Sequence, residues 1–236
     1  MKKLLLILCS NLLISTVVKA QLGAEGYLDM GETLVSGGFY SQFSAIGSFE
    51  QKKWGVQGGA QLGLVQPQDV IFNSWYASPY AKLKIGNTPL VLGGEYLWTA
   101  FSPDLREIDW IMYAKTSLIH WQFSLGTGTR IYRFSHKAQQ PDEQGNSITE
   151  RWNVMYQVKY LIKPIENKWN LSFTLTDFDH FIIMQENNPM YNMRFDYKLS
   201  APLSLYSELW YKSAGLMVIK VTYYGMFLRL GLLWDI

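Results

Sequence analysis

The sequence contains one cysteine, Cys9, and it lies among the first twenty residues. We expect those residues to be removed on export, which leaves no disulfide, no thiol nucleophile and no cysteine-ligated metal in the mature chain. Beyond residue 20 no run approaches 18 consecutive apolar residues, so membrane-spanning helices are excluded. Charged residues make up 17% of the chain, the formal net charge is +2, and no basic cluster forms the concentrated positive face that nucleic-acid binding requires.

Residues 1–20 predict a secretory signal peptide. Lys2 and Lys3 supply the positive start, residues 4–18 form the apolar stretch, and Val18 and Ala20 stand where a signal peptidase reads the chain. The alternative is a membrane anchor, but the apolar stretch is shorter than the roughly 20 residues of a spanning helix and polar residues interrupt it. The predicted organisation is a signal peptide over 1–20 and one domain over 21–236.

The rest of the chain shows a period of two. Between residues 151 and 162 apolar side chains alternate with mostly polar ones, and segments 169–175, 191–199 and 226–234 repeat the pattern. Successive side chains on a strand point to opposite faces, so each segment predicts a strand with one apolar and one polar face. Twelve such segments are expected, near 22–30, 34–49, 53–65, 72–86, 89–101, 107–118, 120–136, 149–163, 168–178, 190–200, 203–213 and 224–236.

The connections between these segments differ in length in a regular way. Those after even-numbered segments are short, and those after odd-numbered segments are generally longer from the third onward. Short turns at one end and longer loops at the other are typical of transmembrane β-barrels. In hydrocarbon an unpaired backbone group is costly, so the last strand is expected to pair with the first. The predicted fold is all-β, an antiparallel up-and-down transmembrane barrel of about 12 strands.

The tryptophans favour a membrane barrel over a soluble β-sandwich, which would also alternate but would bury its apolar face. Eight of the nine tryptophans lie on the apolar face of the alternating segments and near the segment ends. Two aromatic girdles at two lipid–water boundaries would require this placement. Trp210 is the one tryptophan on the polar face of its predicted strand. The predicted girdle residues at the end with short turns are Trp54, Trp121, Trp169 and Trp234, and those toward the other end are Trp75, Trp98, Trp110 and Trp152.

With its leader, its alternating strands and its aromatic girdles, the chain resembles the Gram-negative outer-membrane β-barrel class, porin-like, with no narrower family identified. The resemblance covers the mature length and implies insertion in the cell outer membrane. Barrels of this class usually end in an aromatic residue. This chain ends in Ile236, with Trp234 two places earlier on the same face.

If the apolar face of each strand contacts lipid, the polar face lines the lumen of the barrel. Its charges either pair and fill the bore, or line a water-filled channel that favours anions because bases are in excess. The sequence leaves both interpretations open. The ionisable residues of this face are seven acids, Glu25, Asp29, Glu95, Asp109, Asp196, Glu208 and Asp235, and ten bases, Lys82, Lys84, Lys115, Arg130, Arg151, Lys159, Arg194, Lys198, Lys212 and Arg229.

Small residues on the same face have two interpretations. Gly55, Gly59 and Gly63 lie on the inner face of the third segment, and Gly93 lies on that of the fifth. They either leave free passage through the bore or let large neighbouring side chains pack across it, and packing is the commoner arrangement.

Enzymatic signals are weak, and no catalytic, metal-binding or cofactor-binding residue is predicted. The best candidate cluster is Asp177, Asp179 and His180, at a strand-to-loop junction near the outer rim, where carboxylates and an imidazole could move protons or bind metal. A solvated loop start is the commoner meaning of such a group.

The sequence is therefore compatible with three functions. The first is a passive outer-membrane channel for small solutes, with an anion preference as the finer hypothesis. The second is a non-conducting barrel that serves as a structural or accessory subunit of an envelope complex. The third is a hydrolase with its site at the rim. The expected partners are outer-membrane lipid and either small solutes or an envelope protein, with no nucleic acid.

Overall fold

A computed structural model of the chain describes residues 20–32, 39–65, 73–102, 105–134, 147–162, 168–179, 182–183, 189–212 and 225–235. The predicted signal peptide, except for Ala20, lies outside them. Among these residues, no helix is long and apolar enough to cross a membrane. The strands are β1 (Gln21–Glu32), β2 (Phe39–Glu50), β3 (Trp54–Val65), β4 (Asn73–Ile85), β5 (Thr88–Ser102), β6 (Leu105–Leu118), β7 (Trp121–Phe134), β8 (Ser147–Ile162), β9 (Trp169–Thr176), β10 (Phe178–Asp179), β11 (Ile182–Ile183), β12 (Met190–Lys198), β13 (Leu203–Lys212) and β14 (Met226–Asp235).

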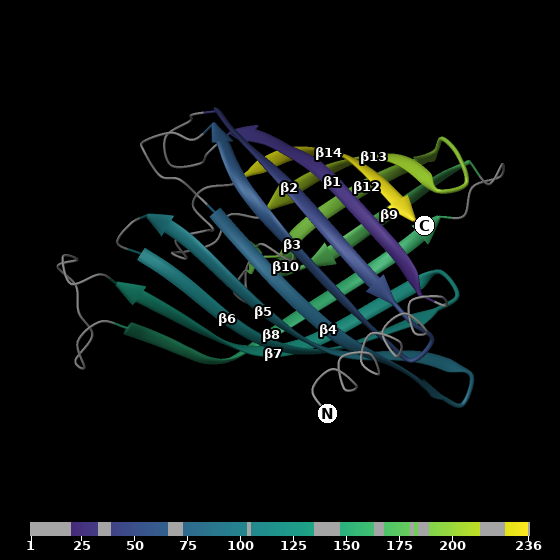
Figure 1. Cartoon of the computed structure of the whole chain (residues 1–236), viewed down its shortest axis with the longest axis horizontal. Coiled ribbons are helices and arrows are strands. Elements are labelled where there is room, and N and C mark those ends of the chain that lie inside the picture. Colours follow the sequence, from purple (N-terminus) through teal and green to yellow (C-terminus); the bar gives the residue numbers. More distant parts are fainter. Residues whose placement is uncertain are drawn as a thin grey trace, which may run out of the picture.

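Twelve of these strands form one closed antiparallel barrel (Figure 1). Each strand pairs with its neighbours along the chain, with β12 following β9 in the ring, and β1 closes the ring by pairing with β14. The two short strands β10 and β11 pair only with each other. The predicted twelve-stranded barrel and its closure between the first and last strands are therefore confirmed. Closure gives the backbone of every wall strand two neighbours, which a sheet in hydrocarbon requires.

Tight connections gather at one end of the barrel, which we call the short-turn end. Residues 51–53 join β2 to β3, Gly86 and Asn87 join β4 to β5, and Ile119 and His120 join β6 to β7. Gly86 has φ 61° and Ile119 has φ 53°, the positive φ that two-residue hairpin turns favour. Glycine adopts this conformation without cost, whereas a β-branched side chain at Ile119 does not.

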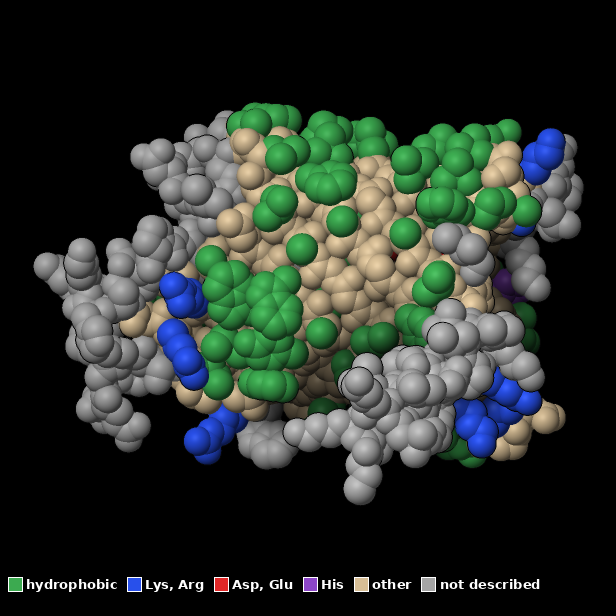
Figure 2. All heavy atoms as spheres, viewed as in Figure 1, with side chains coloured by type: hydrophobic (Ala, Val, Ile, Leu, Met, Phe, Trp, Pro, Cys, Tyr) green, Lys and Arg blue, Asp and Glu red, His purple; other side chains and the backbone are tan. Residues whose placement is uncertain are grey.

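The alternation predicted from sequence separates the two faces of the wall. On β14, Leu228, Leu230 and Leu232 are exposed on the outside, whereas Phe227 and Arg229 are buried inside. Figure 2 shows apolar side chains over the visible wall and basic side chains near its two ends. The exposed bases are Lys52, Lys53, Lys84, Lys168 and Lys198 at the short-turn end, and Arg106, Arg133 and Arg151 toward the other. This distribution suits a wall in lipid with its charges at the water boundaries.

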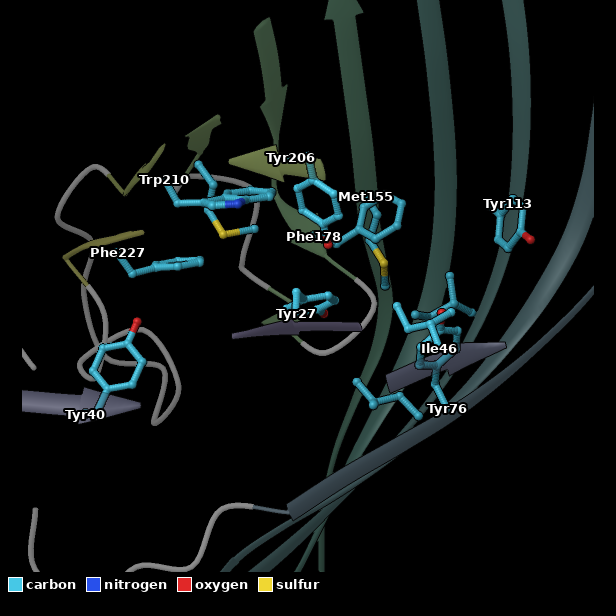
Figure 3. Packing of buried hydrophobic residues seen from close by; sticks show 13 residues of the cluster. Tyr27, Tyr40, Ile46, Tyr76, Tyr113, Met155, Phe178, Tyr206, Trp210 and Phe227 are labelled. Atoms are coloured by element: carbon cyan, nitrogen blue, oxygen red, sulfur yellow. The ribbon is translucent and has the colours of Figure 1, made fainter. Parts of the chain in front are cut away.

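The inside of the barrel contains a packed apolar cluster (Figure 3). The rings of Trp210 and Phe227 stack with centroids 5.6 Å apart, and both residues are buried, as the polar parity of Trp210 predicted. Glycines on facing strands make room for inward rings: Tyr113 lies over Gly93 and Tyr206 lies over Gly231. The structure thus supports packing across the inner glycines over free passage at these positions.

Gly128 gives this packing a direct test. A Cβ on Gly128 would lie 2.7 Å from the carbonyl oxygen of Trp110 and 2.9 Å from Cε of Met155, whereas a Cβ on Gly47 would meet nothing within 4 Å. We expect Gly128→Ala to lower the free energy of unfolding by about 1–3 kcal/mol, because backbone must move. Gly47→Ala should be neutral or slightly stabilising. Denaturant unfolding in lipid vesicles measures both, and equal effects would contradict the close packing.

Candidate functional site in the barrel interior

A polar cavity of about 180 Å³ lies inside the barrel. Side chains from β1, β2, β6, β8, β9, β12, β13 and β14 line it, together with residues of β10. Seven of the lining residues are charged: the acids Glu25, Asp179 and Glu208, and the bases Lys115, Lys159, Arg194 and Arg229. Ionised groups that meet across a space of this size can bind water or a small polar solute.

One row of alternating charges crosses four neighbouring strands beside the cavity. Asp29 on β1 is directly opposite Arg229 on β14, Arg229 is opposite Glu208 on β13, and Glu208 is opposite Arg194 on β12. Opposite charges at directly facing positions stabilise antiparallel pairs. The row spans the seam where the first and last strands meet, and we call it the charge row.

Arg229 has the most contacts of the charge row. Its Nε donates to Oδ1 of Asp29 at 2.7 Å, and its Nη2 donates to Oδ2 of Asp29 at 3.0 Å and to Oδ2 of Asp179 at 2.8 Å. Its Nη1 lies 3.5 Å from Oε2 of Glu208. The guanidinium also lies over the ring of Tyr27, 3.9 Å from its centroid. These contacts fix the buried cation in one orientation.

Arg194 is held in a similar way. Its Nη1 donates to Oε1 of Glu208 at 2.9 Å, and its Nε donates to Oδ1 of Asp196 at 2.8 Å. Its guanidinium lies over the ring of Tyr206, 3.8 Å from the centroid, and the Tyr206 hydroxyl donates to Glu25 at 2.5 Å. Both arginines of the cavity are therefore paired with carboxylates from the barrel's own wall.

The two lysines of the cavity differ from the arginines. Lys115 on β6 and Lys159 on β8 are half-buried, and neither has an ion-pair partner within 4 Å among the residues that the structure describes. The Nζ of Lys115 lies over the ring of Tyr113, 4.4 Å from its centroid. A half-buried ammonium needs water or an anion beside it. Lys115 and Lys159 are therefore the two bases of the cavity that form no direct ion pair with a described residue.

Residues Asp177–Asp179, which we call the inward segment, leave the barrel wall after β9 and enter the bore. The Oδ1 of Asp177 accepts a hydrogen bond from the backbone N–H of Tyr156 at 2.7 Å. Phe178 belongs to the apolar cluster, and Asp179 reaches Arg229. The sequence-based placement of Asp177 and Asp179 at a solvated rim is wrong, because both lie inside. His180 lies outside the described residues.

A second ionic cluster lies on β6 and β7. The Nε of Arg130 lies 3.3 Å from Oδ1 of Asp109 and 3.9 Å from Oε1 of Glu107, and all three residues are buried. Glu107 was not predicted to line the lumen, although it lies on the same face of its strand as Asp109. Near the short-turn end, Lys82 pairs with Glu50, which also accepts a hydrogen bond from Tyr80 at 2.9 Å.

Other predicted lumen residues lie away from the cavity. Lys84, Lys198 and Asp235 have the inner parity but are exposed at the short-turn end. Arg151 is exposed beside a β-bulge, where the β8 partners of Gly128 and Arg130 jump from Asn153 to Glu150. Glu95 is buried but does not line the cavity, and the side chain of Lys212 lies outside the described residues. Of the nine predicted bases whose side chains the structure describes, four therefore line the cavity.

The predicted girdle tryptophans lie on the outside wherever the structure describes them fully. Trp54, Trp75, Trp110, Trp121 and Trp234 are exposed, and Trp98 and Trp169 are half-exposed. The rings meet other outward aromatics, as in the pairs Trp121–Tyr160, with centroids 4.7 Å apart, and Tyr96–Trp110, at 4.6 Å. The side chain of Trp152 lies outside the described residues. Among those residues, no group of three His, Cys, Asp or Glu side chains could hold a metal ion.

Comparison with known proteins identifies the fold. No family model and no curated protein sequence matches the chain. Among solved structures it is similar to the NanC porin (TM-score 0.55, 11% identity, covering 90% of this chain and 98% of that one) and to the KdgM porin (TM-score 0.54, 8% identity, 90% and 98%). It is also similar to the outer-membrane protein Omp33 of Acinetobacter baumannii (TM-score 0.52, 10% identity, 93% and 100%). The chain thus has a porin-like outer-membrane β-barrel fold.

Proposed function

We propose that the protein is a passive channel for small solutes in the cell outer membrane, to which it is exported by a cleaved signal peptide. The observation that carries the proposal is the polar cavity enclosed by the barrel, with charged side chains on opposite parts of its wall. The apolar outer surface, the girdle tryptophans and the fold shared with porins support the membrane location. Water and ions need a polar path of this kind to cross a hydrocarbon layer.

The finer proposal is a preference for anions. Four bases and three acids line the cavity, and the arginines among them are already paired with carboxylates. Lys115 and Lys159 form no direct ion pair with a described residue, so they are the cations that a passing anion can approach. We expect the anion preference to be weaker than the ten bases of the sequence pattern suggest, because five of the described bases lie away from the cavity.

Planar-bilayer recording of the mature protein tests both proposals. We expect stepwise conductance and, in a KCl gradient, a reversal potential displaced toward that of chloride. Changing Lys115 and Lys159 to glutamine should move the reversal potential toward zero, because the unpaired cations are lost. The matched control is Lys84→Gln, an exposed lysine that should change little. A reversal potential displaced toward that of potassium would contradict the anion preference, and a folded barrel without current would contradict the channel.

The second candidate function, a non-conducting accessory barrel, is favoured by one specific observation. An apolar cluster that includes Tyr76, Leu97 and Met155 occupies the interior, and these side chains are at most 2% exposed. If these packed side chains close the bore where they lie, solutes cannot pass. If correctly folded protein, identified by its heat-modifiable mobility on a gel, remains electrically silent, this candidate replaces the channel, and its partner would be another envelope protein.

A further inference from the structure

The guanidinium of Arg229 has two edges that can each bind a carboxylate. Asp29, on the neighbouring wall strand, takes the Nε–Nη2 edge with two hydrogen bonds of 2.7 and 3.0 Å. The Nη1–Nη2 edge meets Asp179 at Nη2, 2.8 Å away, and Glu208 at Nη1, 3.5 Å away. Asp29 thus holds the arginine in place, and the second edge is left for a carboxylate on the cavity side.

Asp179 differs from the other acids around Arg229 in its origin. Asp29 and Glu208 belong to wall strands and lie directly opposite Arg229 in the sheet. Asp179 belongs to the inward segment, outside the twelve-stranded sheet, and its carboxylate enters the cavity from a connection between wall strands. The chain therefore brings a carboxylate of its own to a position that a dissolved carboxylate could also occupy.

The part of the cavity across from Arg229 also favours the binding of a carboxylate. Lys115 and Lys159 line the space that Asp179 and Arg229 line, and no described carboxylate lies within 4 Å of either lysine nitrogen. A solute with two carboxylates could bind Arg229 with one group and approach a lysine with the other. The cavity of about 180 Å³ is smaller than the roughly 300–1,000 Å³ of pockets for drug-sized ligands, so it restricts such a solute to a few heavy atoms.

We propose that Arg229, Lys115 and Lys159 form a binding site for small carboxylate solutes, and that Asp179 occupies this site as an intramolecular competitor. The inference deepens the proposed channel function by naming the class of solute. A tethered competitor acts at an effective concentration in the millimolar range, so its removal increases the apparent affinity of a free ligand. Removal of the Asp179 carboxylate also changes the charged lining of the cavity from four bases and three acids to four bases and two acids.

Isothermal titration of the mature protein in detergent micelles tests the proposal without requiring a current. The probe is succinate, and its neutral analogue succinamide is the control ligand, both at constant ionic strength. Asp179→Asn removes the charge with little change of shape, and Asp179→Ala empties the position. We expect both variants to bind succinate at least about tenfold more tightly than the unmodified protein does. The protein control is Asp235→Ala, which changes an exposed carboxylate and should have no effect.

A second pair of variants assigns the site. In the Asp179→Asn background, Lys159→Gln should weaken succinate binding several-fold, whereas Lys198→Gln, at the exposed short-turn end, should not. Unchanged succinate affinity in both Asp179 variants, or equal binding of succinamide, would overturn the proposal. Electrical silence with tight succinate binding would contradict only the channel, and conductance without succinate binding would contradict only the carboxylate site.

Discussion

Arginine in place of Leu230 should lower the free energy of unfolding by about 2–4 kcal/mol in a lipid bilayer. Leu230 lies midway along β14 with its side chain exposed on the outside of the barrel, between the inward residues Arg229 and Gly231. A guanidinium at this depth has only hydrocarbon around it. Arginine in place of Ile85, the last residue of β4 beside the turn at Gly86, should cost only about 0–1 kcal/mol, because it can reach water.

The measurement is equilibrium unfolding in guanidinium with the protein inserted in lipid vesicles, followed by tryptophan fluorescence. The pair of variants isolates depth, since both place the same charge on the same outer face. Equal costs at the two positions would mean that the outer wall does not cross a hydrocarbon layer. A soluble protein would tolerate both arginines, because both positions would already face water.

The fold could be predicted from the sequence because each strand carries information about both of its faces. The wall touches lipid outside and polar or packed groups inside, so the period of two survives along nearly every strand. The largest differences lie at strand ends. Residues 34–38 of the segment predicted over 34–49 lie outside the described residues, and the segment predicted over 168–178 leaves the wall after Thr176. There Asp177 bonds to the backbone of β8 with its side chain and turns the chain inward, which alternation does not encode.

The candidate site could be predicted only in part, because parity gives direction but not register or depth. Arg229, Glu208 and Arg194 had the inner parity, yet their order in one row depends on which residues face each other across strands. Asp179 was a candidate residue, but at the outer rim; its position beside Arg229 could not be predicted, since it lies on a connection that folds into the bore. The bulge near Arg151 interrupts the alternation of inward and outward side chains. Lys84 and Lys198 are on the inward face of their strands, but they lie close enough to the strand ends to reach water.

Loss of Arg229 should be among the most damaging changes in the interior. Among the described residues, Arg229 is the only cation paired with Asp29, whose side chain is 2% exposed, so Arg229→Met leaves that carboxylate buried without compensation. We expect a loss of about 3–5 kcal/mol in the free energy of unfolding. Arg133→Met, which removes an exposed arginine near the end of β7, should stay within about 0.5 kcal/mol of the unmodified protein.

A double-mutant cycle shows whether this loss comes from the charge row at the seam. Asp29→Asn removes the charge that Arg229→Met leaves behind, so the double variant should be more stable than the sum of the two single losses implies, by about 0.5–3 kcal/mol. Additive losses would mean that the two side chains act separately. Because Asp29 and Arg229 face each other across the first and last strands, their coupling would measure how strongly the row holds the barrel closed.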